Sequence, residues 1–279
     1  MFKAQIFFTI LMAVSACGTA PEKTESATDK AALALPATIE EAVNSVYRDP
    51  ANRERDIFRH PVETLKFFGL TPAMTVVEIS PGAGWYMEIL APLLASNGKY
   101  IAAAPPSSSG EYAQKANDKR AAWVSSYPRI QDKVTTNVFN PPSSTDIAPP
   151  GSADMVLTFR NVHNWIKAKG EQEAFNAFFK ALKPGGILGV TEHRAPANQK
   201  RDPEAKSGYV RERDVIALAK RAGFKLAAKS EINANPKDTK DHPEGVWTLP
   251  PTLRLKEKDR EKYLAMGESD RMTLKFVKP

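Results

Sequence analysis

Residues 75–94 read TVVEISPGAGWYMEILAPLL, and the hydrophobic pattern changes its period within this segment. Residues 75–79 are mostly β-branched and apolar, as in a buried strand. A turn rich in proline and glycine follows at residues 80–84. The apolar residues beyond the turn have the spacing of one helix face: Met87, Leu90 and Leu94. The segment therefore predicts a strand, a tight loop and a helix.

The loop contains two glycines, Gly82 and Gly84. Because glycine has no Cβ and adopts positive φ, a ligand can approach this backbone closely, and the following helix offers free N–H donors. A dinucleotide-binding fingerprint would need a third glycine where Met87 stands, and a P-loop would need Gly-Lys-Ser/Thr, which the segment lacks. The loop is thus predicted to bind a ligand of another kind.

The acid at the end of the predicted strand narrows the choice of ligand. Glu78 precedes Gly82 by four residues, and this run resembles motif I of the class I S-adenosylmethionine-dependent methyltransferases, commonly acid-x-Gly-x-Gly-x-Gly. Ser80 stands where the first glycine is expected. The motif by itself also suits an ordinary strand-to-helix turn of another α/β protein. The resemblance implies S-adenosylmethionine as cofactor, bound by Glu78, Ser80, Pro81, Gly82 and Gly84.

Further segments make the resemblance more specific. Leu-Lys-Pro-Gly-Gly at 182–186, followed by an apolar strand, resembles the hairpin after the motifs of class I methyltransferases. The strand that contains Asp154 resembles motif IV, and residues 271–277 alternate as in the terminal strand of that family. The resemblance covers about residues 60–279 and is closest to a bacterial group of predicted exported methyltransferases. It implies an α/β fold with a doubly wound, Rossmann-like sheet of seven mostly parallel strands and an antiparallel C-terminal hairpin strand.

The first 17 residues have the pattern of an export signal. A lone Lys3 precedes the apolar run 6–14, which is too short to span a bilayer permanently and ends in small residues. Val-Ser-Ala-Cys at 14–17 resembles the bacterial lipobox, which implies lipidation of Cys17; ordinary cleavage after Ala16 is the alternative. Cys17 is the only cysteine, so lipidation would leave no unpaired thiol in an oxidising compartment.

The predicted organisation follows from this signal. Residues 1–17 are the signal peptide with its lipobox, residues 18–36 a flexible polar tether, and residues 37–279 one methyltransferase-like domain. Because Gly18 stands where an Asp would signal inner-membrane retention, the resemblance implies a periplasm-facing lipoprotein of the outer membrane. The formal charge of +7 is scattered along the chain without a basic stripe, so nucleic acid is not a predicted partner.

The next strands supply the other predicted cofactor contacts. Most family members carry an acid near the end of the second strand that binds the ribose hydroxyls, but residues 102–106 contain none. Glu111 is the nearest carboxylate downstream. The resemblance places Asn140, after the third predicted strand, beside the adenine. Arg160, after the strand 153–159, is predicted to contact the cofactor as well.

Polar and aromatic residues follow two further strands, at the edge where a doubly wound sheet binds ligands. Methyl transfer is an in-line displacement, which needs alignment and, for a protonated acceptor, a base. His163 is the predicted base or acceptor-orienting group, and Glu192 or His193 is the second choice. The predicted acceptor contacts are Asn161, Asn164, Trp165 and Trp247. Packing of His163 and Trp165 against the next helix, and a solvated loop at residues 192–194, are the structural alternatives.

Three expectations concern the surroundings of this site. Residues 233–254 contain three prolines shortly after His242 and are predicted to form an irregular excursion that folds over the pocket. The helix predicted at 171–182 should bury its aromatic face in the core. The four histidines are spread along the chain, so no metal centre is predicted.

Two functions are consistent with these features. The first is S-adenosylmethionine-dependent methyl transfer to a small-molecule acceptor by an envelope-anchored lipoprotein. The second is a non-catalytic binding protein of the envelope, because the ribose-binding acid is missing and S-adenosylmethionine is made inside the cell. A local likeness of residues 78–86 to the isoaspartyl methyltransferase loop keeps protein repair open as a substrate class.

Overall fold

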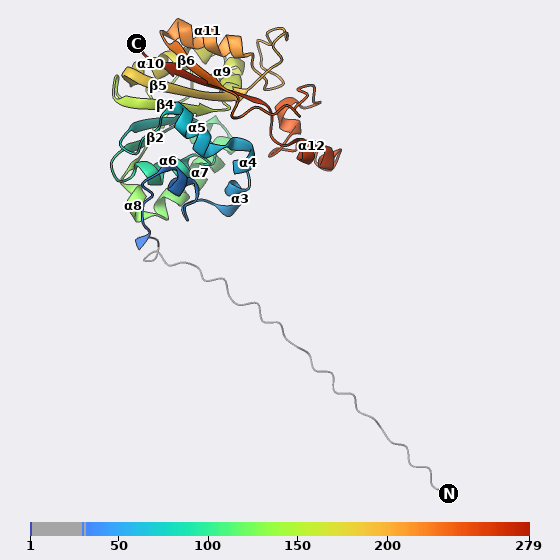
Figure 1. Cartoon of the computed structure of the whole chain (residues 1–279), viewed down its shortest axis with the longest axis horizontal. Helices are drawn as coiled ribbons and strands as arrows, with labels where there is room; N and C mark the ends of the chain where they lie inside the picture. The colour runs from blue at the N-terminus through green and yellow to red at the C-terminus, as the bar shows by residue number, and fades with distance from the viewer. Residues whose placement is uncertain (2–29, 31) are drawn as a thin grey trace.

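One sheet carries the elements that position the candidate site. The structure, a computed structural model, describes residue 1, residue 30 and residues 32–279. Seven strands within these residues are ordered β3-β2-β1-β4-β5-β7-β6 across the sheet (Figure 1). Their bounds are β1 (Thr75–Ile79), β2 (Lys99–Ala104), β3 (Val134–Val138), β4 (Ala153–Phe159), β5 (Leu182–His193), β6 (Lys225–Ser230) and β7 (Arg271–Val277).

The strand pairing confirms the predicted fold class. Strands β3, β2, β1, β4 and β5 run parallel, whereas β7 is antiparallel to both β5 and β6. Parallel neighbours cannot be joined by tight turns, and helices make the crossovers. The sheet is therefore doubly wound and mostly parallel, with antiparallel pairing confined to the C-terminal strands.

The helices of the described residues alternate with these strands as the periodicity predicts, with two exceptions. The polar segment after residue 160, predicted as a loop, is the helix α9, and α12 was not predicted. The helical elements are α2 (Ile39–Val43), α3 (Pro50–Arg53), α4 (Asp56–Arg59), α5 (Pro61–Phe68), α6 (Met87–Leu94), η1 (Ser107–Ser109), α7 (Glu111–Ser125), α8 (Pro128–Gln131), α9 (Val162–Lys167), α10 (Glu171–Ala181), α11 (Glu212–Ala222), η2 (Gly245–Thr248) and α12 (Arg260–Met266).

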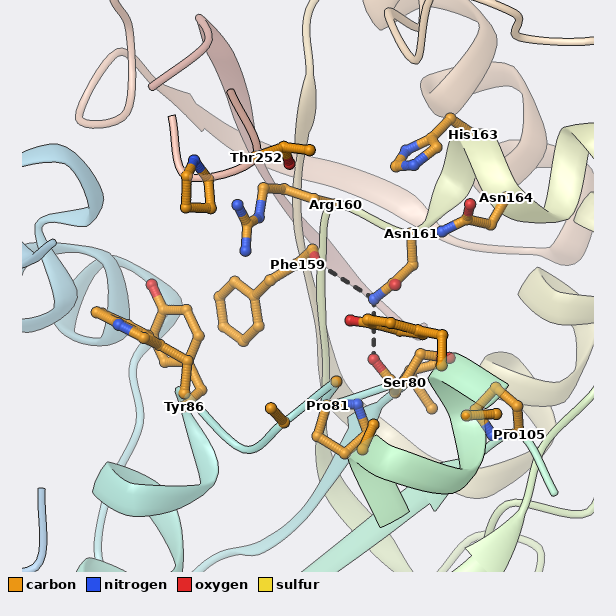
Figure 2. A pocket seen from close by; sticks show the side chains of 18 of the residues that line it. Ser80, Pro81, Tyr86, Pro105, Phe159, Arg160, Asn161, His163, Asn164 and Thr252 are labelled. Atoms are coloured by element: carbon orange, nitrogen blue, oxygen red, sulfur yellow. Dashed lines mark hydrogen bonds between the residues drawn. The ribbon is translucent and has the colours of Figure 1, made fainter. Parts of the chain in front are cut away.

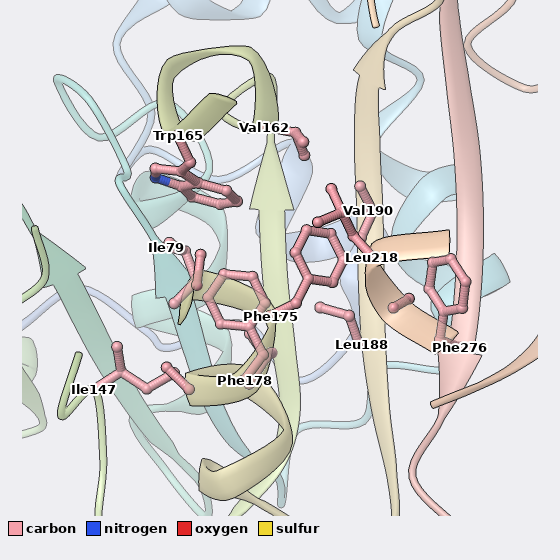
Figure 3. Packing of buried hydrophobic residues seen from close by; sticks show 14 of the residues in the cluster. Ile79, Ile147, Val162, Trp165, Phe175, Phe178, Leu188, Val190, Leu218 and Phe276 are labelled. Atoms are coloured by element: carbon pink, nitrogen blue, oxygen red, sulfur yellow. The ribbon is translucent and has the colours of Figure 1, made fainter. Parts of the chain in front are cut away.

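The core is divided by the sheet into two hydrophobic clusters. Successive side chains of a strand point to opposite faces, so Val77 and Ile79 of β1 join one cluster and Val76 joins the other. The first cluster contains Phe175 and Phe178 of α10, which confirms that the aromatic face of this helix is core (Figure 3). The second cluster receives the apolar faces of α5 and α6.

The strand register brings three chain segments to one edge of the sheet. Ile79, at the end of β1, is opposite Thr158 of β4, and Phe159 is opposite Thr191 of β5. The residues that follow these strands are therefore neighbours in space: 80–84, 160–165 and 192–193. This edge is where ligands bind in doubly wound sheets.

The N-terminal helices are held against α6 by buried polar contacts. The Glu88 carboxylate accepts hydrogen bonds from the Asp49 N–H at 3.1 Å and from the Asn52 side chain at 2.9 Å. Arg48 makes a bidentate ion pair with Asp56 at 2.6 and 2.9 Å. These contacts position α3 and α4 beside the loop that follows β1.

The predicted signal peptide from residue 2 onward, including Cys17, lies outside the described residues, as does most of the predicted tether. Among the residues that are described, no helix is both long and apolar enough to cross a membrane.

Candidate active site

A cavity of about 930 Å³ opens at the carboxyl edge of the sheet. Its walls come from the ends of β1, β4 and β5, from α7 and from the segment around η2 (Figure 2). Two predicted site residues, Gly84 and Glu192, do not line the cavity. The predicted residues that line it are Glu78, Ser80, Pro81, Gly82, Asn140, Arg160, Asn161, His163, Asn164, Trp165, His193 and Trp247.

The loop after β1 has the left-handed backbone that its glycines predict. φ is +59° at Gly82 and +98° at Gly84. A Cβ at Gly82 would lie 3.4 Å from the Tyr112 hydroxyl, so the missing side chain keeps a narrow space open at the cavity wall. Gly84 instead forms the turn into α6, because its N–H donates to the Pro81 carbonyl and its carbonyl accepts from Glu88. The prediction that Gly84 faces the ligand is corrected accordingly.

Ser80 occupies the position of the first motif glycine with φ of +50°. A side chain in this region is strained by contact of Cβ with the following carbonyl. We expect Ser80→Gly to raise the free energy of unfolding by about 1 kcal/mol, offset in part by the greater freedom of glycine in the unfolded chain. Chemical denaturation of both proteins measures this difference. A loss of stability would show that the Ser80 side chain contributes more than its backbone strain costs.

Helix α7 contributes residues that were missed in the sequence. Arg120 donates hydrogen bonds to the Gly82 carbonyl and to the Asn117 side chain, which braces the glycine loop from above. Tyr112 and Asn117 line the cavity at the same end. Glu111 also lines it, so a carboxylate lies beyond β2 although residues 102–106 contain none. The only available signal was that this helix follows the second strand.

Glu78 is buried at the end of β1 and accepts a hydrogen bond of 2.6 Å from the Tyr100 hydroxyl. Burial raises its pKa to about 7, and the Tyr100 hydrogen bond and the Arg120 charge offset only part of this increase. The carboxyl group therefore titrates near neutral pH. It is the acid at the glycine loop, where a cationic ligand would favour its ionised form.

The central pair of the site is His163 and Glu192. Nδ1 of His163 lies 3.1 Å from Oε1 of Glu192. Glu192 is fully buried, and its oxygens also accept from the backbone N–H groups of Val162 and His193. A carboxylate that accepts from these backbone donors assigns the His163 proton to Nδ1, which leaves Nε2 as the basic nitrogen. Glu192 thus does not reach a ligand, and its position is that of an orienting group.

His193 lies beside this pair, with its ring centroid 5.3 Å from that of His163. Its Nδ1 is hydrogen-bonded to the Ser269 hydroxyl. Burial, reinforced by the nearby His163, holds the pKa of His193 well below its usual value. His193 is therefore a neutral group of the cavity wall.

The expectation that the histidines are too far apart for a metal centre is wrong. His163, Glu192 and His193 place ligand atoms within 4.8 Å of one another, and all three are buried. Two histidines and one carboxylate are a common donor set for zinc and non-haem iron. Here Nδ1 of each histidine and both carboxylate oxygens already take part in hydrogen bonds within the protein. We therefore interpret the set as a base with its orienting groups.

Two predicted acceptor contacts have structural roles. The Asn161 side-chain nitrogen donates to the Ile79 carbonyl at 3.0 Å and ties the end of β4 to that of β1 (Figure 2). The Trp165 ring packs edge-on against Phe139 and Phe178 and belongs to the core, although it reaches the cavity (Figure 3). Asn164, one turn along the same helix, is exposed at the cavity.

The aromatic wall differs from the predicted pair of tryptophans. Tyr86 and Phe159 stack with ring centroids 3.6 Å apart and an interplanar angle of 11°, and both line the cavity. Trp247 lies on another side, with its ring centroid 5.8 Å from that of His163. The residues flanking Trp247 in the excursion, Val246 and Pro250–Thr252, line the cavity too. The prediction that this excursion folds over the pocket is confirmed.

Comparison with solved structures decides the fold family. The structure is similar to a SAM dependent methyltransferase from Aquifex aeolicus over 86% of this chain and 98% of that chain, with a TM-score of 0.50 and 17% sequence identity. The chain has the class I methyltransferase fold.

Two other solved structures share this methyltransferase fold. Phosphoethanolamine N-methyltransferase 2 of Haemonchus contortus, in complex with S-adenosyl-L-methionine, matches 91% of this chain and 57% of that chain, with a TM-score of 0.51 and 15% identity. The [4+2]-cyclase SpnF matches 82% of this chain and 81% of that chain, with a TM-score of 0.51 and 17% identity. No protein-family model matches the sequence, and no curated protein does.

Proposed function

We propose that the protein transfers a methyl group from S-adenosylmethionine to a small-molecule acceptor. The observation that carries this proposal is that one cavity is bounded both by the glycine loop after β1 and by His163, whose Nδ1 is held by Glu192. A cofactor loop and an oriented base at one cavity are what methyl transfer to a protonated nucleophile requires.

The residues at the loop fit the cofactor. The bare backbone at Gly82 allows close approach, Glu78 offers a carboxylate to a cationic group, and Glu111 lies at the end of the cavity beyond β2. When bound, S-adenosylmethionine supplies a methyl group on a positively charged sulfur. The stacked rings of Tyr86 and Phe159 present an aromatic surface, which attracts such cations.

The acceptor is assigned to the side of the cavity near His163. Nε2 of His163 is placed to take the acceptor proton as the nucleophile attacks, and the hydrogen bond from Nδ1 to Glu192 stabilises the resulting imidazolium. Asn164 and Trp247 line the cavity beside His163 and would orient the acceptor. Pro250 to Thr252 cover this side and reduce the access of water.

A non-catalytic envelope binding protein remains the second candidate, and one observation favours it. The end of β2 offers no acid to the ribose hydroxyls, since residues 102–106 are Ala, Ala, Ala, Pro and Pro. The similarity to a [4+2]-cyclase also shows that this fold serves chemistry other than methyl transfer. The binding of cofactor therefore decides between the two candidates.

We propose further that the protein acts in the bacterial envelope, anchored by a lipid on Cys17 and facing the periplasm. The support is the apolar run 6–14 followed by Val-Ser-Ala-Cys. Replacing Cys17 by Ser should release the protein from the membrane fraction, and metabolic labelling with palmitate measures the loss of lipid.

Titration calorimetry of S-adenosylmethionine and S-adenosylhomocysteine tests the cofactor site. We expect saturable binding to the wild-type protein, weakened at least about tenfold by Gly82→Leu, because the added side chain fills the narrow space beside Tyr112. Gly151→Leu is the matched control: its φ of +64° is close to that of Gly82, and the site is open and outside the cavity. No binding of either compound to the wild-type protein at millimolar concentration would refute methyl transfer and favour the binding protein.

A further inference from the structure

Four arginine side chains of the described residues converge on one buried carboxylate at the cavity. Glu268, in the loop between α12 and β7, is only 2% exposed. Its contacts come from chain segments more than 200 residues apart. They are Arg55 Nε at 2.8 Å, Arg59 Nε at 3.2 Å, Arg160 Nη1 at 3.6 Å and Arg271 Nη1 at 2.9 Å.

This arginine cluster, Arg55, Arg59, Arg160 and Arg271 around Glu268, carries an excess of positive charge. Guanidinium groups do not lose their protons in proteins, so one carboxylate offsets only one of the four charges. The neighbouring side chains Trp85, Tyr86 and His193 add no negative charge. Mutual repulsion of partly buried cations is costly unless an anion lies among them.

One atom of the cluster points to where that anion binds. Nη2 of Arg59 is buried and has no hydrogen-bond partner, although the residue lines the cavity and is only 3% exposed. The guanidinium lies over the Trp85 ring, 4.5 Å from its centre, which fixes its plane. A charged donor held in place and left unpaired is unfavourable without a ligand. Arg55 and Arg160 line the cavity beside it.

The geometry points to a binding site for an anionic group, a carboxylate or a phosphate, of the molecule that occupies the cavity. Planar guanidinium groups bind both kinds of anion through paired hydrogen bonds, and three of the four arginines reach the cavity. The inference rests on the proposed function, because it assigns the anionic group either to the cofactor carboxylate or to the acceptor. Figure 2 shows Arg160 well separated from Ser80 and Pro81 of the glycine loop.

Binding of inorganic phosphate to the full-length protein tests the anion site. We expect phosphate to raise the thermal midpoint relative to chloride at equal ionic strength, and calorimetry to show saturable binding. Arg160→Gln should weaken phosphate binding at least about tenfold, because it removes the more exposed of the two charges that reach farthest from Glu268. Arg160→Lys should retain part of the affinity.

Arg254→Gln is the matched control. Arg254 also lines the cavity, but its guanidinium is paired with Glu244 at 3.3 Å and stacks on Trp247, outside the cluster. We expect phosphate affinity to change less than about twofold in this variant. Equal losses in the two glutamine variants would overturn the inference, and so would the absence of phosphate binding to the wild-type protein.

A comparison of two adenosine ligands identifies the source of the anionic group. S-Adenosylhomocysteine carries a carboxylate, whereas 5′-methylthioadenosine has the same adenosine and thioether without it. Weaker binding of only the former to Arg160→Gln assigns the site to the cofactor carboxylate. Unchanged binding of both, with phosphate binding lost, assigns it to an anionic acceptor. If the wild-type protein binds phosphate but neither adenosine ligand, the anion site stands and the proposed methyl transfer fails.

Discussion

Replacing His163 by Gln is expected to reduce methyl transfer by about 10²- to 10⁴-fold, the usual contribution of a general base. The glutamine amide can still donate to Glu192 but has no basic nitrogen for the acceptor. Cofactor affinity should stay within about twofold, because the glycine loop is untouched. Transfer of a tritiated methyl group from S-adenosylmethionine into an extract of envelope small molecules measures the rate.

The control is His60→Asn, since His60 lies outside the cavity and asparagine tolerates its φ of +43°. This variant should transfer methyl groups at the wild-type rate. Full activity of His163→Gln would rule out the base. A chelator should leave the wild-type rate unchanged; loss of activity that zinc restores would instead identify His163, Glu192 and His193 as metal ligands.

Glu78→Gln is expected to make the protein more resistant to unfolding at alkaline pH. The folded-state pKa of Glu78 is about 7, above its ordinary value of 4.5, so the native state retains a proton that the unfolded chain releases. Stability that this proton provides is present below pH 4.5 and is lost as the pH rises to about 7. Relative to wild type, the variant should gain about 3 kcal/mol between pH 4 and pH 8.

Urea denaturation of both proteins across this pH range measures the gain, since other titrating groups cancel in the difference. Tyr100→Phe provides a second test. It removes the hydrogen bond that favours the ionised carboxylate, so the loss of stability should extend to higher pH. A difference between wild type and Glu78→Gln that does not vary with pH would contradict the buried, proton-retaining carboxyl group.

Local pattern was enough to predict the elements of the fold. The β-branched run at 75–79, the two glycines of the turn and the apolar spacing of α10 each act over a few residues, where strand and helix periods differ. The segment after residue 160 was the exception. Its polar residues suggested a loop, but burial of Val162, Trp165 and Ile166 against the sheet stabilises α9.

Candidate site residues were predictable only as a list, because ends of parallel strands meet at one edge whatever the intervening chain. Their division of labour was not. Glu192 and Gly84 were predicted to face a ligand, yet the fold buries the first behind His163 and uses the second to start α6. Neighbours in space decide such roles, and the residues adjacent in the chain do not record them.

The amino-acid order was sufficient for the strand-loop-helix unit at residues 75–94, for the doubly wound sheet and for a ligand loop with an acid at its entrance, since these depend on residues close together in the chain. Tertiary structure alone decided the pairing of His163 with Glu192 and the gathering of Arg55, Arg59, Arg160 and Arg271 around Glu268. The physical reason is that charge and hydrogen bonding act through space, and no period along the chain links residues that lie 29 or more than 200 positions apart.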